Sequence, residues 1–187
     1  QGESGGTLQG APMPALASDV HGALAYLATR AEVDTRRVGL VGHSEGGLIA
    51  GYLGARYPDL VDFMVLLGSP GVSGDAILGD QLAARAEQAG MQGPRVEGQL
   101  QTQQRVFDVL KQDADSAAIA SELRTVIAET SGIRQQETIE REIRGLMDPW
   151  FRFFVRYDPV SDLQQLTQPV LALLAERDQQ VRPALNA

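Results

Sequence analysis

The chain has 187 residues, of which 43% are hydrophobic, with 24 acidic against 16 basic side chains and a net charge of −8. Its length and hydrophobic content predict one ordinary domain, or a core with an insertion, and its acidic balance argues against nucleic acid as a partner. Cysteine is absent and only two histidines occur. This excludes disulfides, thiolate catalysis, cysteine-ligated zinc and a histidine-rich metal site, and no cofactor is expected.

No apolar run reaches the length of about 18 residues that a transmembrane helix needs, and the start of the chain has no signal-peptide pattern. The compartment, cytoplasmic or exported, is left open. The chain begins at Gln1 without an initiating methionine and stops at Ala187, shortly after a predicted strand and loop. We therefore expect a piece of a longer protein.

The first predicted element is a helix over residues 16–30. Four apolar residues recur in it at helical spacing: Leu16, Val20, Leu24 and Leu27. His21 lies near the middle of this helix and is interpreted as a surface or packing residue. The apolar run Val38–Val41 follows, bounded by charge and glycine, which is typical of a parallel strand buried on both faces.

Residues 42–47 read Gly-His-Ser-Glu-Gly-Gly and have the G-x-S-x-G pattern of a nucleophile elbow, in which a serine sits on a tight strand-to-helix turn. A serine hydroxyl needs such exposure, together with a base and an oxyanion site, to act as a nucleophile. We expect Gly42 and Gly46 to be crowded, so that side chains there would clash. The alternative is an ordinary or phosphate-binding glycine-rich turn, but the Walker lysine and a G-x-G-x-x-G pattern after a strand are both missing.

A helix is predicted from Gly47 to Tyr57, where Pro58 ends it. Its small residues would let it lie close to a sheet: Gly46, Gly47, Ala50, Gly51 and Gly54. Two further apolar runs, Phe63–Leu67 and Val170–Leu174, complete a set of three predicted parallel strands. The sequence thus predicts an α/β fold.

About a hundred residues between the second and third strands are predicted to be helical throughout. Apolar residues fall on one helical face in two stretches: Ile119, Leu123, Val126 and Ile127, then Ile139, Ile143, Leu146 and Met147. We interpret residues 73–157 as a helical cap insertion over the carboxyl edge of the sheet. Residues 1–72 and 158–187 would form the core.

Residues 148–157 hold five of the ten aromatic side chains. Asp148 is a good N-cap and Pro149 fits the first helical position, so a helix is predicted to start here. The simpler interpretation of the aromatic cluster is a hydrophobic anchor that ties the insertion to the core. The alternative is that His43 and the rings of Trp150, Phe153 and Phe154 line an acyl pocket.

Asp178 follows the last predicted strand by a few residues, where open α/β sheets build their sites. It is therefore a candidate for the acid of a catalytic triad. A solvated loop aspartate is the competing interpretation, and Asp75, after the second strand, is the weaker alternative for the acid.

Residues 26–34 and 36–47 together resemble the α/β-hydrolase superfamily, in particular bacterial dienelactone-hydrolase-like and S9-peptidase-like esterases. Residues 2–6 are similar to the glycine-rich loop after the fourth strand of those proteins. Residues 149–159 and 168–181 resemble their return from the cap and their acid-bearing loop. The resemblance covers both ends of the chain and is vague in the helical middle.

The resemblance implies that the three strands are the fifth, sixth and seventh of an eight-stranded sheet. Ser44 would be the nucleophile, the backbone N–H of Glu45 an oxyanion donor, and Asp178 the acid. The family's catalytic histidine lies after an eighth strand that this chain does not reach. His43 is instead interpreted as a packing or supporting residue.

These observations predict a serine hydrolase that cleaves a small-molecule carboxylic ester through an acyl-enzyme. The alternatives are an S9-like peptidase or aminoacyl hydrolase, and a non-catalytic binding domain on a degenerate hydrolase fold. The chain by itself is expected to be nearly inactive for want of the histidine. The edge of Val38–Val41 is expected to be open, which predicts self-association.

Overall fold

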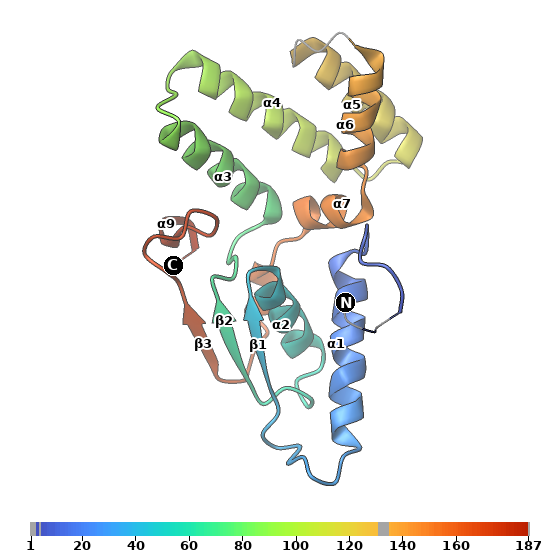
Figure 1. Ribbon diagram of the computed structural model, residues 1–187, viewed down its shortest axis with the longest axis vertical. Helices are drawn as coiled ribbons and strands as arrows, with labels where there is room; N and C mark the ends of the chain where they lie inside the picture. Colours follow the sequence, from blue (N-terminus) through green and yellow to red (C-terminus); the bar gives the residue numbers. More distant parts are fainter. Residues whose placement is uncertain (1–2, 4, 131–134, 187) are drawn as a thin grey trace.

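The computed structural model describes residues 3, 5–130 and 135–186, and within them three strands form a parallel sheet (Figure 1). The strands are β1 (Gly39–His43), β2 (Phe63–Leu67) and β3 (Val170–Leu173), in the order β1-β2-β3. The register places Val41 beside Val65, and Val65 beside Leu171. All three predicted strands are confirmed.

Helix α2 (Glu45–Arg56) joins β1 to β2 and packs closely on the sheet. A methyl group placed at Gly54 would lie 2.8 Å from Cε of Met64, and one at Gly47 would lie 2.4 Å from Cβ of Ser69. The small residues predicted for this helix therefore do allow it to approach the strands. Met64 and Leu66, which face it, are buried.

Helix α1 (Met13–Ala28) and the short helix α8 (Val160–Leu163) lie beside α2. Helix α1 starts three residues earlier than predicted, because Pro12 and Pro14 favour a helix start at Met13. A hydrophobic cluster joins these helices to the sheet: Leu24, Ala50, Val61, Met64 and Leu66. Leu27, predicted to share the buried face of α1, is exposed.

The opposite face of the sheet carries no helix of the described residues. Strand alternation directs Val41, Phe63 and Leu171 to this face, and they are exposed at 68%, 41% and 54%. The prediction that Val38–Val41 is buried on both faces is therefore wrong. Burial on both faces needs a second layer of helices, and the described helices gather on one face or beyond the strand ends.

The long stretch between β2 and β3 is helical, as predicted, and lies beyond the carboxyl ends of the strands (Figure 1). Its helices are α3 (Gly74–Gln88), α4 (Pro94–Lys111), α5 (Ser116–Thr130), α6 (Gln136–Leu146) and α7 (Pro149–Arg156). Both predicted apolar faces contribute to a second hydrophobic cluster, which includes Ile119, Leu123 and Ile139. The predicted boundaries of the insertion, residues 73 and 157, place the second cluster in the insertion and the first in the core. The division into two parts stays a prediction.

Helix α7 begins as the sequence predicts. The side chain of Asp148 accepts a hydrogen bond from the backbone N–H of Trp150 at 2.9 Å, and Pro149 occupies the first position. A short helix, α9 (Pro183–Asn186), ends the described chain. None of the helices in the described ranges is both long and apolar enough to cross a membrane.

Candidate active site

Ser44 sits between the end of β1 and the start of α2 in a strained backbone conformation, with φ 54° and ψ −121°. Among the described residues it is the only non-glycine residue with positive φ. Its N–H donates to the carbonyl of Leu67 at 3.0 Å, and its own carbonyl accepts from the N–H of Gly47 at 2.9 Å. Such strain costs about 1–3 kcal/mol and persists only where the surrounding structure holds it, which is typical of a nucleophile elbow.

Within the elbow, Gly42 is a position where a side chain would clash. A methyl group there would lie 2.2 Å from the carbonyl oxygen of Gly46, so Gly42 has to be glycine. The expectation for Gly46 is wrong, because a methyl group at Gly46 meets no heavy atom within 4 Å. The turn presses the carbonyl of Gly46, and not its Cα, against Gly42. The second crowded position is Gly47, against Ser69.

Glu45, the first residue of α2, directly follows Ser44. Within the described residues its backbone N–H has no hydrogen-bond acceptor, as is usual in the first turn of a helix. Its side chain accepts a hydrogen bond from the indole Nε1 of Trp150 at 2.6 Å. The N–H is thus free to face a bound oxyanion, while the carboxylate connects α2 to α7.

Asp178 lies in the loop after β3, and backbone groups hold its carboxylate in one orientation. Oδ1 accepts from the N–H of Gln180 at 2.8 Å and from the N–H of Val181 at 2.9 Å. Oδ2 lies over the end of β2, 3.2 Å from the position of a methyl group placed at Gly68. One oxygen of the carboxylate is therefore fixed and the other remains available to a partner.

The structure brings Ser44 and Asp178 into one open hollow of about 410 Å³, at the carboxyl ends of the strands. The pairing of His43 with Leu67, and the hydrogen bond from the N–H of Gly68 to the carbonyl of Leu173 at 2.8 Å, align these ends at one edge. The other residues around the hollow are His43, Gly68, Arg177, Gln179, Gln180 and Val181. A carbonyl substrate and an imidazole would both have to enter here.

The two histidines occupy different places. His43 is exposed at the end of β1 and lines the hollow, but no hydrogen bond within the described residues joins its ring to Ser44 or Asp178. The ring of His21 packs against that of Tyr57, tilted by 37° with ring centroids 4.3 Å apart, and does not line the hollow. His21 is therefore a packing residue.

Asp75 is engaged elsewhere. Its side chain accepts from Oγ of Ser73 at 2.6 Å and pairs with Lys111 of α4. Burial acts to raise the pKa of Asp75, but the hydrogen bonds from Lys111 and Ser73 outweigh it and hold that pKa below its usual value. This carboxylate fastens α3 to α4, which leaves Asp178 as the acid candidate.

The aromatic residues proposed as pocket lining lie apart from the hollow of Ser44. Trp150 and Phe154 stack on each other at 5.4 Å, and Trp150 is linked to the residue after Ser44 by its hydrogen bond to Glu45. Phe153 stacks on Tyr157 at 5.4 Å and lines a separate hollow beside α2. Of the four candidates for pocket lining, His43 is the one that shares the hollow with Ser44.

A family model described as the alpha/beta hydrolase fold matches residues 12–186, nearly the whole chain. The chain belongs to the α/β-hydrolase fold family. This α/β-hydrolase chain has a partial form of the fold, with three parallel strands in the described residues. The strained Ser44 at a strand-to-helix turn is the local geometry expected of that family.

Among solved structures, the α/β-hydrolase chain is similar to a hydrolase from Pseudomonas aeruginosa PA01, with 17% sequence identity and a TM-score of 0.38. The match covers 92% of this chain and 57% of that one, so the chain spans a little over half the length of the solved protein. A comparison with curated proteins finds no match.

Sequence reasoning missed the contacts that support the candidate site. Gly68, beside Asp178, could have been found as the glycine directly after the second predicted strand. The hydrogen bond between Trp150 and Glu45 spans 105 residues, and no local pattern indicates it.

Proposed function

We propose that this chain carries the nucleophile and the acid of a serine hydrolase that cleaves carboxylic esters through an acyl-enzyme on Ser44. The observation that supports it is the strained Ser44 in one hollow with Asp178, whose carboxylate has one oxygen fixed and one available. An ordinary glycine-rich turn would have no need of a strained serine at its apex.

In the proposed reaction, Oγ of Ser44 attacks the ester carbonyl carbon and its proton passes to a histidine. The tetrahedral oxyanion accepts a hydrogen bond from the N–H of Glu45. Collapse expels the alcohol, which takes the proton from the imidazolium, and water then releases the acid by the same steps. Oδ2 of Asp178 would hold the imidazole in the required tautomer and orientation.

We propose that the histidine comes from outside these 187 residues, because the described geometry of neither histidine favours it as the base. His43 directly precedes the nucleophile and makes no hydrogen bond with it, and His21 packs on Tyr57. The 187-residue chain alone is then expected to hydrolyse esters several orders of magnitude more slowly than the full-length protein.

The test uses a fluorophosphonate probe and p-nitrophenyl esters on the full-length protein, with Ser44→Ala as the control. Labelling and turnover that both disappear in Ser44→Ala support the proposal. Faster cleavage of aminoacyl-arylamides than of esters would show that the protein is a peptidase and not an esterase. Absence of both labelling and turnover would mean a binding domain, and brisk turnover by the 187-residue chain would place the base within it.

A further inference from the structure

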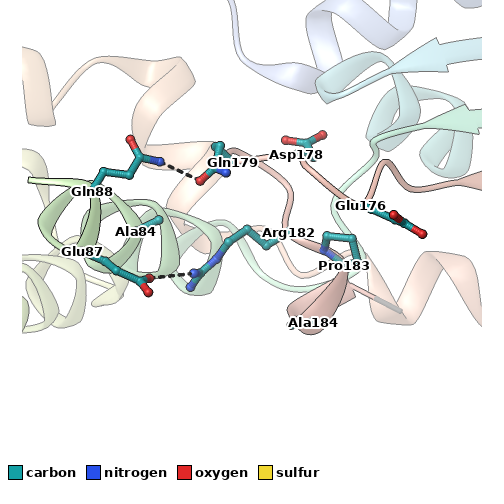
Figure 2. Close-up of a pocket in the computed structure, with 9 residues that line it drawn as sticks. All are labelled: Ala84, Glu87, Gln88, Glu176, Asp178, Gln179, Arg182, Pro183 and Ala184. Carbon is teal, nitrogen blue, oxygen red and sulfur yellow. Dashed lines mark hydrogen bonds and ion pairs between the residues drawn. The ribbon is translucent and has the colours of Figure 1, made fainter.

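Helix α3 is joined to the loop that carries Asp178 by a row of polar contacts (Figure 2). The guanidinium of Arg182 makes a bidentate pair with Asp80, with Nε to Oδ2 at 2.8 Å, and lies 3.8 Å from Glu87. The amide of Gln88 donates to Gln179 at 2.6 Å. The amide of Gln81 donates to the carbonyl of Gln180 at 3.1 Å. One helix therefore holds the loop at several positions.

These contacts span an open hollow of about 590 Å³ between α3 and the loop. Figure 2 shows Gln88 and Glu87 reaching across it to Gln179 and Arg182. The apolar residues that line this space are small, namely Ala84, Pro183 and Ala184, so the polar contacts are the main links across it between the helix and the loop. Asp178 lines this hollow and also the hollow of Ser44, so it forms part of the wall between them.

The bidentate pair is the strongest of these contacts. Both of its partners are charged and the two hydrogen bonds are parallel, a geometry that adds direction as well as energy. The side chains of Arg182 and Asp80 are 31% and 15% exposed, so solvent screens the pair less than an ordinary surface pair. The contact with Glu87, which is 77% exposed, adds little.

Arg182 is also well placed to act on the carboxylate of Asp178. It follows Val181, whose N–H is one of the two that hold Oδ1, and the side chain of Val181 is buried. A displacement of Arg182 would shift that N–H and turn the carboxylate. We infer that the Asp80–Arg182 pair is a positioning device through which α3 sets the orientation of Asp178.

This inference rests on the proposed function, in which Asp178 orients the catalytic base. Asp80 and Arg182 touch neither substrate nor base in that reaction and act only through Asp178. They are therefore positioning residues. Helix α3 is the first helix of the segment 74–156. The pair would therefore make the orientation of Asp178 depend on how that segment is positioned relative to the core.

The test uses two variants that break the ion pair, Arg182→Gln and the shape-preserving Asp80→Asn. They are compared with a control variant and with a variant in which the two charges are exchanged. The matched control is Arg85→Gln, which makes the same change at an exposed position of α3 where the side chain has no ion pair within the described residues. The double variant Asp80→Arg with Arg182→Asp exchanges the charges and is expected to restore the contact. All variants are made in the full-length protein.

The first readout is amide hydrogen exchange at Gln180 and Val181, whose N–H groups bind Asp178. We expect exchange to be about 10-fold faster in Arg182→Gln and Asp80→Asn, near the native rate in the double variant, and native in Arg85→Gln. Exchange at Met64, in the centre of the sheet, reports on the fold and should not change. Equal exchange in all variants overturns the inference, whether or not the protein hydrolyses esters.

The second readout is the kinetics of ester cleavage. We expect kcat to fall roughly 10- to 100-fold in the two single variants with KM unchanged, because a misoriented acid affects the transition state and not substrate binding. Faster exchange with kcat equal to that of Arg85→Gln would overturn the catalytic part of the inference. A native protein that neither labels nor turns over would overturn the proposed function, while the exchange data would still decide whether the pair orients Asp178.

Discussion

Gly42 and Ser44 determine the geometry of the elbow. Ser44 adopts a backbone conformation that costs free energy, and the strand, the helix and the carbonyl of Leu67 hold it there. Gly42 lets the carbonyl of Gly46 come close enough for the turn to close. The turn therefore needs glycine at position 42 but not at position 46, a difference that substitutions can test.

We expect Gly42→Ala to lower the free energy of unfolding by about 3 kcal/mol or more, because its methyl group would overlap the carbonyl of Gly46. Gly46→Ala is the matched control. It lies in open space within the first turn of α2 and should leave stability unchanged or raise it by up to about 1 kcal/mol. Urea denaturation measures both, and equal losses in the two variants would contradict the geometry described.

The hydrogen bond from Trp150 to Glu45 predicts that a single substitution at Trp150 lowers the stability of the fold. Trp150→Phe keeps a ring to stack on Phe154 but removes the N–H that Glu45 accepts. We expect it to lower the free energy of unfolding by about 1–3 kcal/mol, the usual range for a partly buried hydrogen bond to a charged group. Glu45→Gln, which keeps an acceptor oxygen, should cost less. Thermal or urea unfolding of both variants checks this order.

Among the elements, α7, α8 and α2 meet at Asp162, the one buried charged residue of the described chain. Asp162 pairs with Arg56 of α2 at 2.9 Å and accepts from the hydroxyl of Tyr157 at 2.6 Å. The Arg56 guanidinium also lies over the ring of Tyr52, 3.5 Å from its centroid. This cluster fastens the chain to α2 as it returns from the helical segment to the core.

Burial, and then the hydrogen bond to the negative Asp162, raise the pKa of Tyr157 above its ordinary value of about 10. Above about pH 10, the Tyr157 hydroxyl therefore keeps its proton in the folded state and loses it in the unfolded state. The contribution of this hydroxyl to stability is complete below the unfolded pKa and is lost as the pH rises above about 10. We expect the free energy of unfolding to fall there by up to about 1.4 kcal/mol per pH unit from this group.

The measurement is urea denaturation between pH 8 and pH 11, with Tyr157→Phe as the test variant. This variant should start less stable, because the hydrogen bond to Asp162 is lost, and should show a shallower fall above about pH 10. Tyr26→Phe, at an exposed position, is the matched control and should keep the native slope. A native slope in Tyr157→Phe would exclude this tyrosine as the source.

For the whole molecule, the main feature is that the described helices cover only one face of the sheet. Val41, Phe63 and Leu171 leave an apolar surface on the other face, and both β1 and β3 are edge strands within the described residues. Exposed apolar faces and open edges both favour association with another chain. A second copy offers the same face and the same open edges, so we propose that the 187-residue chain self-associates.

We expect sedimentation of the 187-residue chain to show dimers or larger species that increase with concentration. The double variant Val41→Lys with Leu171→Lys puts charge on the uncovered face and should shift the chain towards the monomer. Thr35→Lys with Gln164→Lys adds the same charge at exposed positions away from that face and should not. A native chain that is monomeric at all concentrations would contradict the proposal.

Much of the fold could be predicted because its causes are local. The three strands are short apolar runs, and the N-cap of α7 follows from Asp148 and Pro149. The elbow could be predicted because it depends on backbone sterics within six residues. Its finer geometry could not, since Gly46 was expected to be crowded and lies in open space. Which faces of the sheet are covered could not be predicted, because Val41 is equally apolar whether a helix lies over it or not.

By itself, the sequence determined the parallel strands, the helical stretch between β2 and β3, and the chain positions of Ser44 and Asp178. Only the tertiary structure decided that these two residues share a hollow, that Asp75 is bound to Lys111, and that Arg182 meets Asp80 across 102 residues. Periodicity and backbone sterics act within a few turns and can be read from neighbouring residues. Contacts between distant residues depend on how whole helices pack, and many pairings of similar side chains satisfy the same local pattern.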